Sequence, residues 1–178
     1  MHDHGDRCHL TLASIHPILD STSNTTIRFD LHHHPSSITL PPDYQSLSPA
    51  TLAEPATHPP LPCLNITVFL LPWSIVVLPS GSPSQNAFVT VSDVLDALHL
   101  ALNLSATPEE LAELASEEIR AEVRAAYERR VQALADWRWR ESERLMGIRR
   151  VDLLMGRTRF LGLSIQGKER NVLVLDIC

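Results

Sequence analysis

Apolar and polar side chains alternate in the first part of the chain. Residues 25–31 follow a period of two, which predicts a strand with one buried face. Residues 64–69 and 73–78 are rich in β-branched and aromatic side chains, and Pro72 between them predicts a hairpin turn. A further short strand is expected over residues 86–89. The first half of the chain therefore supplies strands.

After these strands the apolar positions change to the spacing of a helix. In residues 90–103 they recur at intervals of three and four, which predicts one buried stripe. Thr90 or Ser92 can cap this helix, and Asp93 favours its positive end. Asn103 is expected to end it. The stripe consists of Val91, Val94, Leu95, Leu98 and Leu102.

A second helix is predicted from a strong start signal. Thr107 is followed by a proline at the first helical position and by Glu110, which together make a capping box. The helix is expected to continue to about residue 145 and to stop at Gly147. Ser116 precedes two glutamates and marks a place where this helix can break and restart.

The last part of the chain returns to short apolar segments. Residues 151–154 and 160–165 are apolar and flank a glycine. Residues 171–177 predict a final strand that is apolar on both faces, so we expect it in the middle of the sheet. Residues 35–62 are rich in proline and serine. They show neither the apolar spacing of a helix nor that of a strand, which predicts an irregular segment.

These elements predict an α+β fold. We expect a small, mostly antiparallel sheet of four or five strands, packed by two or three helices, with the last strand at the C-terminus. Residues 1–15 are expected to be a mobile tail. Residues 16–178 are expected to form one domain, because the first part has too few helices and the second too few strands to close a core alone.

The composition is that of an ordinary globular domain. The apolar share of 44% and the charged share of 20% exclude a collagen, a disordered chain and a disulfide scaffold. Cys8, Cys63 and Cys178 lack paired spacing, so we expect free thiols in a reducing compartment. The polar N-terminus shows no secretory signal, and no apolar run reaches the ~20 residues of a membrane helix. We expect no membrane partner and a cytoplasmic location, with the nucleus as the alternative.

An ordered set of short motifs resembles a known family. The chain is similar to fungal proteins, abundant in mushroom-forming fungi, that are catalogued as domain of unknown function 6699. The resemblance covers about residues 16–177 and implies a small α+β domain. It does not imply any particular activity, since no catalytic or binding residues are established for the family. Its motifs are His16-Pro17-Ile18-Leu19, Phe29-Asp30-Leu31, Pro55-Ala56-Thr57 with Pro59-Pro60, Pro72-Trp73-Ser74-Ile75, residues 89–98, Arg130, residues 150–154, Thr158, Phe160 and Gly162-Leu163.

A basic, tryptophan-containing region is the leading candidate site. Residues 129–170 contain 11 basic and 5 acidic residues, although the whole chain carries a net charge of −6. Trp137 and Trp139 point about 200° apart on a helix, so they cannot both face one core. Exposed tryptophan and arginine are typical of binding hot spots. The alternative is that one tryptophan lies in the core, the other covers the helix end, and the arginines are solvated or paired with Glu141, Glu143 and Asp152. The candidate partner-binding residues are Trp137, Arg138, Trp139, Arg140 and Arg144.

The same residue types can also stack on bases and bind phosphates. The acidic net charge argues against nucleic acid, however.

Asp152 lies in an apolar segment and needs a partner if it is buried. We expect a structural ion pair with Arg130 or Arg150.

Two other kinds of site are suggested more weakly. Histidines, Asp3 and Cys8 near the N-terminus, with a later histidine run, could bind a transition metal, but a mobile segment gives adventitious binding, so we expect no metal site. The histidines in this set are His2, His4, His9, His16, His32, His33 and His34. A hydrolytic triad could use Cys63 with one histidine and one aspartate, although no nucleophile motif accompanies them. Its candidates are His58, His99, Asp30 and Asp93.

The sequence therefore predicts a non-enzymatic, intracellular protein-interaction module without a cofactor. The alternative is a small-molecule-binding or hydrolytic domain with a pocket between the sheet and residues 35–62. Metal binding by the histidine-rich N-terminus is the weaker alternative.

Overall fold

Four strands form the main sheet of the protein, which we describe from a computed structural model covering residues 14–23, 27–41, 45–69, 71–81, 88–165 and 172–178. The strand order is β6-β5-β8-β7. The hairpin of β5 (Leu64–Thr67) and β6 (Ser74–Val77) confirms the sequence prediction. The sheet also contains β7 (Phe160–Ile165) and β8 (Val172–Ile177).

The C-terminal strand β8 lies in the middle of the sheet, as its two apolar faces predicted. It pairs antiparallel with β7 and parallel with β5, so that Ile66 lies opposite Leu173. The sheet has one parallel strand pair and two antiparallel strand pairs, so it is mixed but mostly antiparallel. The fold is α+β, with the sequence's last strand at its C-terminus.

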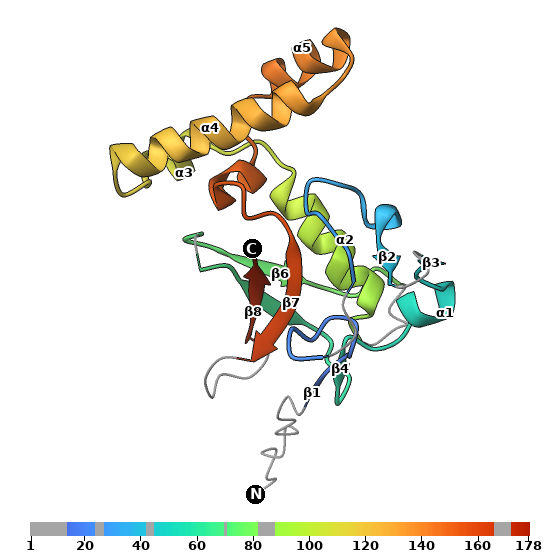
Figure 1. Cartoon of the computed structure of the whole chain (residues 1–178). Helices are drawn as coiled ribbons and strands as arrows, with labels where there is room; N and C mark the ends of the chain where they lie inside the picture. The colour runs from blue at the N-terminus through green and yellow to red at the C-terminus, as the bar shows by residue number, and fades with distance from the viewer. Residues whose placement is uncertain (1–13, 24–26, 42–44, 70, 82–87, 166–171) are drawn as a thin grey trace, which may run out of the picture.

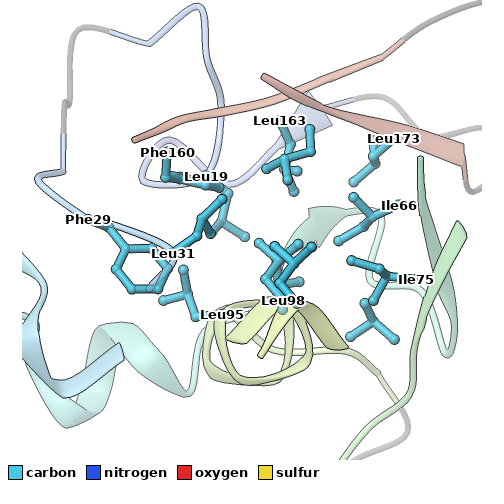
Figure 2. Packing of buried hydrophobic residues seen from close by; sticks show 14 of the residues in the cluster. Leu19, Phe29, Leu31, Ile66, Ile75, Leu95, Leu98, Phe160, Leu163 and Leu173 are labelled. Atoms are coloured by element: carbon cyan, nitrogen blue, oxygen red, sulfur yellow. The ribbon is translucent and has the colours of Figure 1, made fainter. Parts of the chain in front are cut away.

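Helix α2 (Val91–Leu102) covers one face of this sheet and closes the core. All five residues of the predicted stripe are buried. Figure 2 shows Leu98 pointing from α2 into the space between the helix and the sheet, while Leu95 lies on the side of Leu31 and Phe29. The helix begins as predicted, since Thr90 and Asp93 form a capping box. Asn103 ends it.

The residues before the main sheet form short elements that pack around this core. β1 (Ser14–Ile15) pairs with β4 (Thr57–His58), and β2 (Thr39–Leu40) pairs with β3 (Gln45–Ser46). Ser14 and Ile15, which the sequence placed in the tail, therefore belong to a strand. Residues 1–13 lie outside the described residues.

The predicted strand over residues 25–31 does not form a regular strand in the part that the structure describes. Residues 24–26 lie outside that part. Arg28 bridges to Thr39 while Asp30 bridges to Arg159, so successive pairs go to different segments and no ladder develops. Its period of two still places alternate side chains in the core, since Ile27, Phe29 and Leu31 are buried.

The proline-rich residues 35–62 contain more regular structure than their composition predicted. They include the 3-10 helix η1 (Pro35–Ser37) and helix α1 (Pro49–Leu52), besides strands β2 to β4. Ser48 caps α1, whose first position is a proline, so a start signal was present in the sequence. Of the expected strand over residues 86–89, the described residues 88 and 89 are not in a strand.

The second predicted helix is three helices. The first break falls at Ser116, as the sequence allowed, between α3 (Pro108–Ala112) and α4 (Glu117–Ala133). The second break was not predicted and separates α4 from α5 (Trp137–Met146), which Asp136 caps. The apolar segment after α5 is also helical, forming the 3-10 helix η2 (Arg150–Leu154).

Helices α4 and α5, here called the arm, lie beyond the layer made by α2 and the sheet (Figure 1). The arm contacts the rest of the protein mainly where α4 packs on η2. We call the sheet and α2 the body. In the part of the chain that the structure describes, no helix has the length and apolar character needed to cross a membrane.

Candidate protein-interaction surface

Helix α5 exposes large apolar side chains. Trp137 and Trp139 are 68% and 66% exposed, and Leu145 and Met146 are also exposed. No residue of α5 is fully buried. The sequence required that at most one tryptophan face a core, and in the structure neither does. We call these four residues the α5 surface.

The α5 surface forms two apolar strips. Trp139 and Met146 are seven positions apart, which places them within about 20° of each other around the helix. Trp137 and Leu145 are eight positions apart, which places them about 80° from each other around the helix, on the side away from Trp139 and Met146. A partner can therefore contact an aromatic and an aliphatic side chain together from either side.

The candidate arginines of α5 have different surroundings. The guanidinium of Arg138 lies 5.6 Å from the ring centre of Trp137, a cation–π distance. Arg144 pairs with Glu141 at 3.6 Å on the exposed face, where such a pair contributes little stability. Arg140 donates from Nε to the carbonyl of Leu134 at 2.6 Å, across the break between α4 and α5. Arg140 therefore supports the turn, whereas Arg138 faces outward beside a tryptophan.

A group of charged side chains around the buried Asp152 fixes the position of α5 relative to η2. Arg130 donates from Nε and Nη2 to the two oxygens of Asp152, at 2.9 and 2.8 Å. Its Nη1 donates to Glu143 of α5, and Glu143 also accepts from Arg149. We call Arg130, Glu143, Arg149 and Asp152 the charged hub. It connects α4, α5 and η2 through direct ion pairs.

The charges of the hub are offset by contacts inside it. Asp152 is completely buried and accepts a third hydrogen bond from the backbone N–H of Arg149. Burial lowers the pKa of Arg130, but its hydrogen bonds to Asp152 and the charges of Asp152 and Glu143 outweigh burial, so its pKa lies above the ordinary value. Arg130 is therefore charged at neutral pH, and the hydrogen bonds of the hub fix its direction.

Arg150, the other candidate partner of Asp152, lies elsewhere. It donates to Glu110 of α3, with contacts of 2.9 and 3.1 Å, and its guanidinium stacks 4.6 Å from the ring centre of Trp73. The sequence identified Glu110 only as a capping residue. The alternative that arginines of this region pair with Glu143 and Asp152 agrees with the structure, although the sequence did not indicate that Arg130 and Arg149 share Glu143.

The candidates for a hydrolytic triad are not brought together. Cys63 contacts the carbonyl of Leu64, and among the described residues no hydrogen bond joins it to a histidine. His99 lies beside Asn103 and His34. Asp93 caps α2. The arrangement therefore lacks the contacts that activate a nucleophile.

One cavity beside the proline-rich segment lies against α2 and not against the main sheet. Its volume is about 380 Å³, and its walls include His34, Leu47, Leu52 and Asp96.

The histidines suggested for metal binding are dispersed, since His16 pairs with Glu54. Within the described part of the chain no three His, Cys, Asp or Glu side chains form a metal-binding group. His2, Asp3, His4, Cys8 and His9 lie outside that part.

The fold and this surface define a small α+β protein whose C-terminal helices present exposed tryptophans. The sequence profile of the Family of unknown function (DUF6699) matches residues 27–171, and the chain belongs to that family. Neither the curated proteins nor the solved structures contain a match. Membership of this family assigns no activity to residues 27–171.

Proposed function

We propose that this protein is a non-enzymatic, intracellular interaction module that binds a protein partner through the α5 surface. The observation that carries this proposal is the exposure of both tryptophans on a helix that partly buried ion pairs connect to α4 and η2. Tryptophan loses little conformational entropy on binding and offers a large contact area. A helix fixed before binding also lowers the entropic cost of association.

The charges around α5 favour a partner with an acidic rim. Arg138 and Arg144 are exposed on this helix, while the carboxylate of Glu143 is held by the hub. Four of the arginines that made the region basic in sequence are already paired with carboxylates, namely Arg130, Arg144, Arg149 and Arg150. This pairing reduces the number of cations available to phosphates and favours protein over nucleic acid.

The proposal is tested by capturing partners from a native lysate with the full chain and with the Trp137→Ala/Trp139→Ala double variant. We expect the principal partner to bind the variant at least about tenfold more weakly, because hot-spot truncations cost ~2 kcal/mol or more. Phe69→Ala is the matched control, since Phe69 is an exposed aromatic residue outside the arm. Identical partner lists for all three proteins would overturn the proposal.

A second measurement separates lost binding from lost structure. The circular dichroism spectrum and melting temperature of the double variant should equal those of the wild type, because neither side chain is buried. Because the proposed partner has an acidic rim, Arg138→Glu should lower its affinity for the protein relative to the wild type. Stronger binding by Arg138→Glu would contradict the charge assignment.

A further inference from the structure

A groove runs between α2 and the edge strand β6, on the body and apart from the arm. It has a volume of about 520 Å³. Its strand side includes Val76 and Leu78, and its helix side includes Leu100 and Leu104. All four are more than half exposed, so the groove is an accessible apolar channel.

Strand β6 offers backbone hydrogen-bonding groups to this groove. It is the last strand of the main sheet, and within the described residues no strand pairs with its outer edge. Every second residue of an edge strand directs its N–H and C=O away from the sheet. An extended segment can therefore add to β6 while its side chains contact α2.

The two ends of the groove differ in charge. At one end lie Asp93 and Asp96, and neither makes an ion pair with the described residues. Burial raises the pKa of Asp93, but hydrogen bonds from Ser80 and Thr90 outweigh burial and keep its pKa below the ordinary value. At the other end Arg150 stacks on Trp73, and its charge is offset by Glu110. The groove is therefore apolar, with one acidic end that makes no ion pair with the described residues.

The direction of β6 decides which end of a bound segment meets the acids. β6 runs from the Trp73 end toward Ser80, whose N–H donates to Asp93 at 3.0 Å. A strand that pairs antiparallel to β6 runs the opposite way and begins beside Asp93 and Asp96. Antiparallel pairing is the more stable and more frequent arrangement.

We propose that the β6–α2 groove binds an extended apolar segment of a partner protein, added antiparallel to β6, with a lysine or arginine at its N-terminal end beside Asp96. Apolar residues at every second position of this segment contact Leu100 and Leu104. This site is independent of the α5 surface, so either can fail without the other.

A library of random ten-residue peptides displayed on phage, selected on the full chain, tests the proposal. We expect enriched peptides to carry a basic residue followed by alternating apolar residues. Leu100→Asp should abolish their binding, because it places a charge in the apolar channel at a position that is exposed in the free protein. The control Leu145→Asp lies on α5 and should bind them like the wild type. Enriched peptides that bind Leu100→Asp unchanged would overturn the proposal.

The charge assignment has its own readout. Asp96→Asn should weaken a selected basic peptide about two- to fivefold in a fluorescence anisotropy titration, the range of an exposed ion pair. The difference should shrink at 1 M salt. Equal affinity for the two proteins at low salt would contradict the orientation. A wild-type dimer that Leu100→Asp dissociates would instead show that a second copy of this chain occupies the groove, and would overturn the partner assignment.

Discussion

The body buries a larger share of its side chains than the arm does. In α2 six of twelve residues are buried, whereas α4 buries three of seventeen and α5 none. The body is held together by apolar contact, which is strong but non-directional. The arm is held by the charged hub, whose ion pairs require particular angles and distances. Stability is therefore concentrated in the body, and the orientation of the α5 surface is set by the hub.

The hub and the body meet at few points. Asn103, at the end of α2, accepts from Arg149 at 3.4 Å and donates to the carbonyl of Leu31 at 2.9 Å. Val123 of α4 and Leu154 of η2 join the apolar cluster of the body. A partner bound to α5 therefore acts on the body through a small junction, and substitutions there test how separate the two regions are.

The largest effect is expected for Asp152→Asn, which keeps the volume of the side chain and removes its charge. Loss of one partner from a buried pair should lower the free energy of unfolding by about 3–5 kcal/mol. Urea unfolding followed by circular dichroism measures this value. Glu141→Gln is the control, because it removes an exposed pair with Arg144 and should change stability by less than about 0.5 kcal/mol. An unchanged melting temperature for Asp152→Asn would show that the hub does not support the fold.

A similar effect from apolar contact alone is expected for Leu98→Ala in the body. Leu98 is completely buried, and such truncations cost about 2–5 kcal/mol. Leu100→Ala on the same helix is the matched control, since Leu100 is 67% exposed and should contribute less than about 0.5 kcal/mol. Equal effects of the two substitutions, measured by urea unfolding, would contradict the placement of the core against this face of α2.

The sequence predicted the body better than the arm, and the reason is the range of the interactions. The α2 stripe and the caps at Thr90 and Thr107 depend on neighbours within one or two helical turns. The break between α4 and α5 depends on the hub, in which Arg130 contacts residues 13 and 22 positions away. Asp136 is a residue type that caps helices and was the one local signal of that break.

The candidate site shows the same division. The angle between Trp137 and Trp139 could be predicted from helical geometry, but their exposure depends on where the hub places α5. The edge position of β6 depends on the parallel pairing of β5 with β8, strands that are about a hundred residues apart. The periodicity of a strand predicts which of its faces is buried, but it does not predict which strands pair with it in the sheet.

A smaller effect compares the helix caps of the two regions. Thr90 is buried, and its hydroxyl both accepts from the N–H of Asp93 and donates to the Asp93 carboxylate. Thr90→Ala should cost about 2 kcal/mol, the upper end for a cap. Thr107 begins α3, a short helix without buried residues, so Thr107→Ala should cost about 0.5 kcal/mol. A larger loss for Thr107→Ala, by thermal unfolding, would place more stability near the arm than the burial indicates.

The smallest effect concerns the pH response of the junction. His32 lies near Asp30, Asp152 and Arg130, and its Nδ1 is buried without a hydrogen-bond partner among the described residues. Burial lowers the pKa of His32 below its ordinary value, and the nearby carboxylates do not fully offset this effect. As the pH falls through the ordinary imidazole range, the unfolded chain binds a proton before the folded protein does. Stability should therefore fall between about pH 7 and the lowered pKa of His32.

Replacing His32 with glutamine should reduce this slope, measured by urea unfolding at pH 7.5 and 5.5. Part of the slope should remain, because burial also lowers the pKa of His99. His58→Gln is the control, since His58 is exposed on β4, away from the junction, and should change the slope less than His32→Gln does. Because His32 lies beside Asp152, hydrogen exchange at pH 5.5 should increase in the arm before it increases in α2. Exchange that rises equally in α2 and the arm would show that the two regions unfold together, and the distinction between them would then concern packing alone.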